Sequence, residues 1–246
     1  MKNSKFRMML FLSVLLLASG MIWAKSPRSL KYEVTITNLT KGQPFSPTVI
    51  AIHKPEMNPL FTLGEPSSEG IWRIAEGGDT SVLVPELSAD PDVYDVQVAV
   101  EDPGNPGPYP PGHSVSVILD SGNARGGRSL SVAGMLGSTN DAFFAINGQP
   151  LPDLPPFFKR VWTEVFYAEA YDAGTEVNSE TCDTVPGPPC NNGNNDRDTE
   201  NAEGYVYVHS GIHGVNGGPP AGLDAGTSDW RNPVARITVR VSRNGF

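Results

Sequence analysis

The sequence predicts an all-β fold, an antiparallel β-sandwich with about eight to ten strands and long end loops. Short runs of residues alternate apolar with polar side chains, which is typical of strands that bury one face. Glycine and proline, at 26 and 23 residues, separate these runs and place turns between them. Helix signals are weak along the chain, so strands should account for most of the regular structure.

Residues 1–24 have the pattern of a secretory signal peptide. Lys2, Lys5 and Arg7 precede an apolar run over 8–17, and small residues lead to a cleavage point after Ala24. The run is too short for a spanning helix, and no later segment approaches 18 consecutive apolar residues. We therefore expect an exported protein, periplasmic or secreted, without a membrane span.

The charge of the remaining chain restricts its partners. Cleavage after residue 24 removes three basic groups and no acidic group, so the net charge of −9 becomes −12. A surface this acidic repels nucleic-acid phosphates and favours divalent cations. No internal repeat or linker divides residues 30–243, which are expected to form one domain that does not bind nucleic acid.

The predicted strands occupy ten segments in chain order. In the last segment, Ile237, Val239 and Val241 are expected to face the core, because side chains alternate between the two faces of a strand. The ten segments are 32–39, 48–53, 80–87, 93–101, 114–120, 129–136, 141–147, 160–172, 204–210 and 235–243.

Two segments have a helical alternative. Residues 155–170 follow a cluster of prolines and could form a helix, but Thr163, Val165 and Phe166 leave the choice between helix and strand open. Residues 68–78 are suited to one helical turn.

The two cysteines are expected to form a disulfide, as in many exported proteins. Cys182 and Cys190 would close a ring of nine residues, which contributes roughly 2 to 3 kcal/mol by chain entropy. The Asn- and Asp-rich residues 191–204 lack the spacing of a calcium-binding hand, so a solvated loop is the preferred interpretation.

The segment AYDAGTEV, residues 170–177, places two carboxylates across a glycine. Asp172 and Glu176 could share a cation if Gly174 adopts a positive φ and tightens the turn. Alternatively, Asp172 forms the turn by accepting a hydrogen bond from its own backbone. The residues alone leave both interpretations open.

Five segments resemble the spondin N-terminal domain family. YDAGTE is similar to the family's Tyr/Trp-Asp-Ala-Gly-Thr-Asp motif, and four further segments resemble family strands and loops in the same order. Together they cover almost all of the mature chain, and the insertion that carries Cys182 and Cys190 resembles the bacterial secreted branch. These further segments are 46–54, 67–79, 130–146 and 232–243.

The resemblance implies a calcium-binding β-sandwich. Carried over position by position, the family's calcium ligands become Asp141, Asp172 and Glu176. Residues 138–140 replace the family's Pro-Ser-Pro, Ala142 replaces a tryptophan, and Glu176 is one methylene longer than the usual aspartate. Weaker calcium binding is expected from these differences.

The expected function is that of a non-enzymatic calcium-binding module for adhesion to an extracellular protein, glycan or surface. A carbohydrate-binding sandwich is one alternative, which needs exposed aromatic side chains; the candidates are Trp72, Tyr109, Trp162 and Trp230. A metal-dependent secreted hydrolase is another, in which Asp172 and Glu176 act with His209 or His213. The two histidines are four residues apart at the end of a predicted strand, so they should point in unrelated directions.

Overall fold

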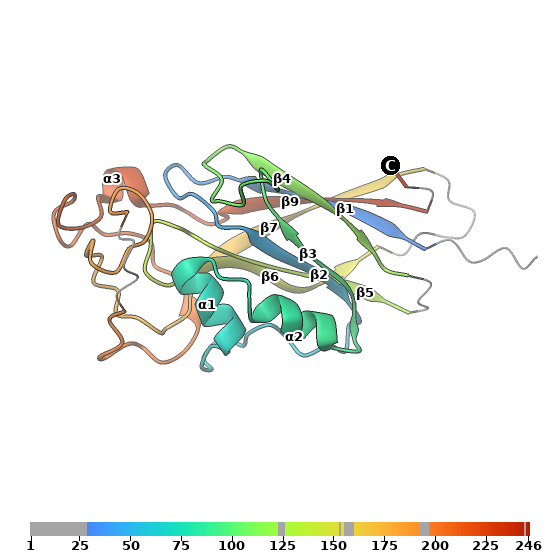
Figure 1. Ribbon diagram of the computed structural model, residues 1–246, viewed down its shortest axis with the longest axis horizontal. Helices are drawn as coiled ribbons and strands as arrows, with labels where there is room; N and C mark the ends of the chain where they lie inside the picture. The colour runs from blue at the N-terminus through green and yellow to red at the C-terminus, as the bar shows by residue number, and fades with distance from the viewer. Residues whose placement is uncertain (1–28, 123–125, 153, 155–159, 192–196, 244) are drawn as a thin grey trace, which may run out of the picture.

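The computed structural model describes residues 29–122, 126–152, 154, 160–191, 197–243 and 245–246. The predicted signal peptide, residues 1–24, therefore lies outside the described residues. The described residues form nine strands, all paired antiparallel, and three short helices (Figure 1). The prediction of a mostly β fold is confirmed. Within these residues, no helix has the length and apolar character needed to cross a membrane.

Eight of the strands follow one another in the order β3-β2-β5-β6-β7-β9-β1-β4, and β8 pairs with β7. The long segment after β7 and helix α3 (Ala225–Ser228) gather at one end of the molecule, opposite the C-terminus (Figure 1). The strands are β1 Lys31–Asn38, β2 Thr48–His53, β3 Val93–Ala99, β4 Ser114–Asp120, β5 Arg128–Met135, β6 Ala142–Leu151, β7 Trp162–Asp172, β8 Tyr207–Val208 and β9 Ala235–Ser242.

Strand β7 pairs with two different strands along its length. Its residues 162–168 pair with β9, whereas residues 169–172 pair with β6. The order ends at β3 and β4, which lie beside each other (Figure 1). The Asp120 amide of β4 donates to Asp95 Oδ2 of β3 at 2.8 Å. The sheet therefore nearly closes on itself.

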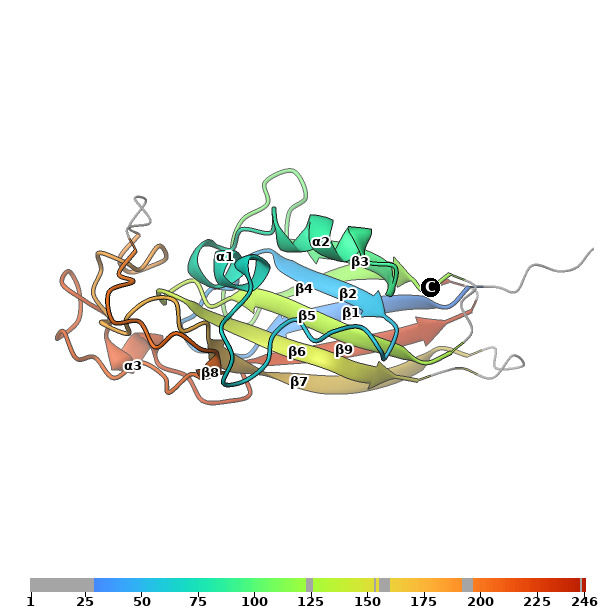
Figure 2. The same cartoon turned by 90° about the horizontal axis from the view of Figure 1, so that it is seen from below.

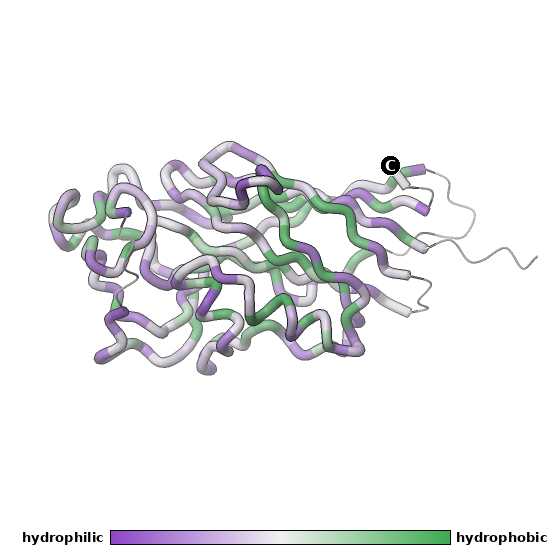
Figure 3. The backbone as a smooth tube through the Cα atoms, in the orientation of Figure 1, coloured by the Kyte–Doolittle hydropathy of each residue, from purple (hydrophilic) through white to green (hydrophobic). Residues whose placement is uncertain are grey.

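The main core is formed by buried side chains from β1 to β7 and β9. The alternation predicted for the last strand is confirmed, because Ile237, Val239 and Val241 are fully buried. They pair with β1, whose Val34 and Ile36 are also buried. Fully burying one such side chain contributes about 1.5 to 3 kcal/mol. Hydrophobic residues follow the strands and hydrophilic ones gather in the end loops (Figure 3).

A second core lies under helices α1 (Glu69–Gly77) and α2 (Leu83–Ala89), which cover the outer face of β2, β5 and β6 (Figure 2). Ser68 caps α1 by accepting from the Ile71 amide, and Gly78 ends it with φ 66°. Ile71 and Ile74 are fully buried in this core. Strands β2 and β5 are consequently buried on both faces.

Three expectations about elements need correction, and one open choice is resolved. The strand predicted at 80–87 is wrong, because Leu83 and Leu87 lie on one face of helix α2 and are buried together. Helix α1 has nine residues, more than the single turn expected. The segment 160–172 is resolved in favour of strand β7. Only Tyr207–Val208 of the strand predicted at 204–210 is extended and paired.

Candidate metal centre

Three carboxylates, Asp141, Asp172 and Glu176, lie where β6 begins and β7 ends. We call them the carboxylate site. Ala142 of β6 pairs with Asp172 of β7, and the Ala173 amide donates to the Asp141 carbonyl at 3.1 Å. An antiparallel pair places the start of one strand beside the end of the other. Residues about 30 positions apart in sequence therefore meet at one end of the sheet.

The turn after β7 depends on Gly174. Its φ is 68°, in the left-handed region, and a Cβ atom there would lie 2.2 Å from the Tyr205 carbonyl oxygen. Asp172 Oδ1 accepts a hydrogen bond from the Gly174 amide at 2.7 Å. The predicted positive φ is confirmed, and so is the turn-forming role of Asp172.

The Asp141 carboxyl is completely buried, and its two oxygens differ sharply. Oδ2 accepts from the Thr175 amide at 2.8 Å, the Thr175 hydroxyl at 3.2 Å and the Glu176 amide at 3.0 Å. Oδ1 is buried and has no hydrogen-bond partner within the described part of the chain. A buried acceptor without a donor costs about 1 to 3 kcal/mol, and more when it is charged.

The Asp172 carboxyl is also completely buried, and polar side chains surround it. Oδ2 accepts from Asn178 Nδ2 at 2.6 Å, and the same amide lies 2.6 Å from the Tyr207 hydroxyl. His209 Nε2 lies 3.7 Å from Oδ2, which is longer than a hydrogen bond. Neither Asn178 nor Tyr207 was expected from the sequence, because no spacing rule brings these residues to Asp172.

All three carboxyls hold a proton more tightly than usual. Burial, and then the charge of Asp172, raise the pKa of Asp141 to about 8. Burial also raises the pKa of Asp172. For Glu176, burial and then the charge of Glu76 raise the pKa to about 7. Negatively charged carboxylates that are buried close together repel each other, so binding of a proton or a cation stabilises them.

The backbone and the side chain of Glu176 have different hydrogen-bond partners. Its amide donates to Asp141, while its Oε1 accepts from the Asp198 amide at 3.0 Å. The side chain lines a cleft of about 190 Å³ together with Trp72, Arg73, Glu76, Gly77, Asp79, Thr184 and Arg197. No group of three His, Cys, Asp or Glu side chains in the described segments has the arrangement of a metal-ligand set.

The predicted aromatic candidates do not share one surface. Tyr109 and Trp230 are buried. The guanidinium groups of Arg73 and Arg197 lie 5.0 and 4.5 Å from the Trp72 ring centre. Trp162, at the start of β7, is 44% exposed. A glycan platform built from these four residues is therefore not assembled.

The two candidate histidines have different neighbours, as their spacing predicted. His209 is buried against Trp230 and faces Asp172. Burial lowers the pKa of His209 to about 4. His213 is exposed, and its Nε2 lies 3.1 Å from the Ser210 hydroxyl.

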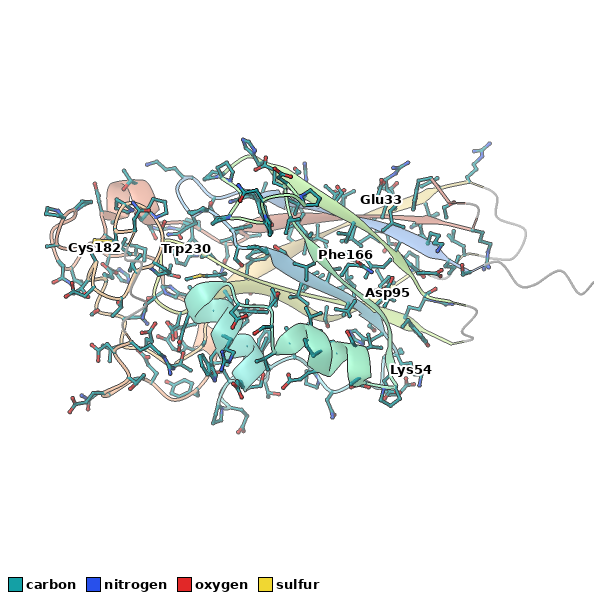
Figure 4. All side chains as sticks on the ribbon, in the orientation of Figure 1. Glu33, Lys54, Asp95, Phe166, Cys182 and Trp230 are labelled. Atoms are coloured by element: carbon teal, nitrogen blue, oxygen red, sulfur yellow. A yellow bond between two sulfur atoms is a disulfide. The ribbon has the colours of Figure 1, made fainter. Side chains whose placement is uncertain are left out.

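The loops around the carboxylate site are held by internal contacts. Cys182 and Cys190 form the predicted disulfide, and Figure 4 shows Cys182 and Trp230 at the end that carries the long loops. The buried Glu180 carboxylate accepts from the amides of residues 213, 214 and 215 at 2.6, 2.6 and 3.0 Å. Part of the solvated loop predicted at 191–204, residues 192–196, lies outside the described residues.

The chain matches no protein-family model and no curated protein with which it was compared. The spondin-type resemblance therefore stays a prediction that depends on its motifs.

Proposed function

We propose that this protein is an exported, non-enzymatic calcium-binding module of spondin-domain type. In this proposal, the ion fixes the end loops, which then bind an extracellular protein or glycan. The observation that carries the proposal is the buried, unpartnered Oδ1 of Asp141, whose carboxyl lies beside the equally buried carboxyl of Asp172.

The donor atoms suit a hard divalent cation. Calcium prefers carboxylate and carbonyl oxygens, usually six to eight of them. Asp141 and Asp172 would hold the ion, and Glu176 would be the third ligand that the resemblance implies. When bound, calcium supplies positive charge that offsets two desolvated carboxylates, and the remaining ligands would be backbone or water oxygens.

The sandwich form of the fold also belongs to this proposal. Strand β7 crosses between the halves β3-β2-β5-β6 and β9-β1-β4, and the main core lies between them. Two facing layers of this kind support a sandwich rather than a round barrel. They place the loops that carry Asp141 and Asp172 together at one end.

Calorimetric titration of the chain from Lys25 onward, stripped with chelator, tests the proposal. We expect calcium binding in the micromolar to millimolar range, as for other carboxylate sites. Asp141→Asn and Asp172→Asn should each weaken binding at least about tenfold, because each removes a charge from the ion's surroundings. Asp102→Asn is the matched control, since Asp102 lies exposed in a loop and should leave binding unchanged. No heat of binding in the native protein would refute the calcium site.

A further inference from the structure

The proton on His209 is located by its backbone neighbour. His209 Nδ1 lies 2.9 Å from the Gly211 amide nitrogen, and a backbone N–H can only donate. Nδ1 must therefore be the acceptor and carry a lone pair. The ring is then neutral, with its single proton on Nε2. Packing against Trp230, at 4.9 Å between ring centres, holds the ring in this orientation.

The protonated nitrogen faces the carboxylate site. Nε2 lies 3.7 Å from Asp172 Oδ2, and it is buried without a hydrogen-bond partner in the described residues. An Nε2–H group at this place directs its positive end toward a carboxylate oxygen. His209 therefore lies against the Asp172 carboxylate at van der Waals distance.

A histidine that binds a metal has the opposite arrangement. Its metal-facing nitrogen offers a lone pair, and its other nitrogen donates an N–H to a carbonyl, carboxylate or water. In His209 the outer nitrogen accepts and the nitrogen facing the site carries the proton. Binding a metal through Nε2 would require the Nδ1–H tautomer, which would set two donors against each other at Gly211.

We propose that His209 is a positioning residue that determines the class of ion at this site. Its Nε2–H faces Asp172 Oδ2 from 3.7 Å, and His209 is not itself a ligand. The site consequently takes hard cations with oxygen ligands, such as calcium and magnesium, and does not recruit the imidazole that zinc and similar metals prefer. The statement about ions rests on the proposed calcium function, whereas the tautomer does not.

Nitrogen-15 NMR of histidine-labelled protein tests the tautomer directly. We expect His209 to show a protonated Nε2 and an unprotonated Nδ1, both in chelator and in saturating calcium. The spectrum of His209→Gln identifies the signals, and exposed His213 serves as an internal reference. A protonated Nδ1 in either condition would overturn the proposal. The NMR measurement tests the tautomer whether or not calcium binds. A failure to bind calcium would refute the proposed function and leave the tautomer result unaffected.

Titrations with calcium and with zinc test the role of the residue. His209→Gln can place an amide N–H near the position of Nε2, so calcium affinity should stay within about threefold of the native value. His209→Ala should lose about tenfold or more, the size of effect typical of residues that orient ligands. Zinc affinity should be equal in native protein and His209→Gln. A tenfold loss of zinc affinity in His209→Gln would show direct ligation and contradict the proposal.

Discussion

At the residue scale, the two carboxylate oxygens of Asp141 have unequal surroundings. Three donors serve Oδ2, while Oδ1 is buried beside a second carboxyl. Such a group is stabilised by a proton at low pH or by a cation at higher pH. Protonation and ion binding therefore compete for the same oxygen.

This competition predicts how stability depends on pH in chelator. The pKa of Asp141 is about 8 in the folded protein, so the carboxyl keeps its proton up to that pH, whereas the unfolded chain releases it near the ordinary aspartate pKa of 3.8. The folded state binds more protons in this window, so the contribution of Asp141 to stability is complete below the unfolded pKa and is lost as the pH rises toward 8.

Urea unfolding at pH 5 and pH 8 in chelator checks this prediction. The free energy of unfolding of the native protein should decline more between the two pH values than that of Asp141→Asn, whose amide does not titrate. Equal declines in both proteins would mean that Asp141 titrates normally. Groups distant from Asp141 titrate alike in the two proteins, so the comparison cancels their effect.

The sequence led to the carboxylates of the site but not to their neighbours. Asp172 and Glu176 were singled out by their spacing across Gly174 and Asp141 by the resemblance, and the pairing of β6 with β7 brings Asp141 and Asp172 together. Asn178 and Tyr207 reach Asp172 from the following turn and from β8. Their contacts depend on how the loops fold back, which no local pattern of residues encodes. The longer side chain of Glu176 likewise turns toward α1, as only the structure shows.

At the element scale, the turn from β7 into the carboxylate site should be sensitive to any side chain at Gly174. Gly174→Ala forces a positive φ on alanine, which costs roughly 1 to 2 kcal/mol, and also pushes Cβ against the Tyr205 backbone. Gly64→Ala is the matched control, because Gly64 has φ 85° and open space around its Cβ position.

Chemical denaturation separates the two effects. Gly64→Ala should show the conformational cost alone, and Gly174→Ala should lose more stability, together with calcium affinity. If both variants lose the same free energy of unfolding, the contact with the Tyr205 backbone does not destabilise the protein.

The strands of the sheet were predicted well, including β2 and β5 beneath the helices, whereas the segment that forms α2 was predicted wrongly. In β9, alternation in the sequence follows alternation in burial. In 80–87, the apolar residues also suggest a strand, but Leu83 and Leu87 are four apart and meet the second core from one face of α2. Short apolar runs fit both periods, so tertiary packing decides between them. The same packing lengthens α1 beyond the turn expected.

At the scale of the whole molecule, ion binding should raise the melting temperature. Calcium at one hundred times its dissociation constant adds about 2.7 kcal/mol of stability. For a chain of this size that corresponds to roughly 5 to 10 °C. Thermal unfolding with calcium and with excess chelator measures the difference, and Asp172→Asn should show little of it. An unchanged melting temperature in the native protein would count against a structural role for the ion.

The pairing of β7 with both β9 and β6 links the strand register to the geometry of the carboxylate site. The strand pairs with β9 through residues 162–168 and ends at Asp172, so one alignment sets both the core and the carboxylate site. A slip of one residue would turn Ala168 out of the core and move Asp172 away from Asp141. A cation that needs both aspartates would stabilise only the correctly aligned chain. Ion binding would then lower the free energy of the native strand register relative to registers shifted by one residue.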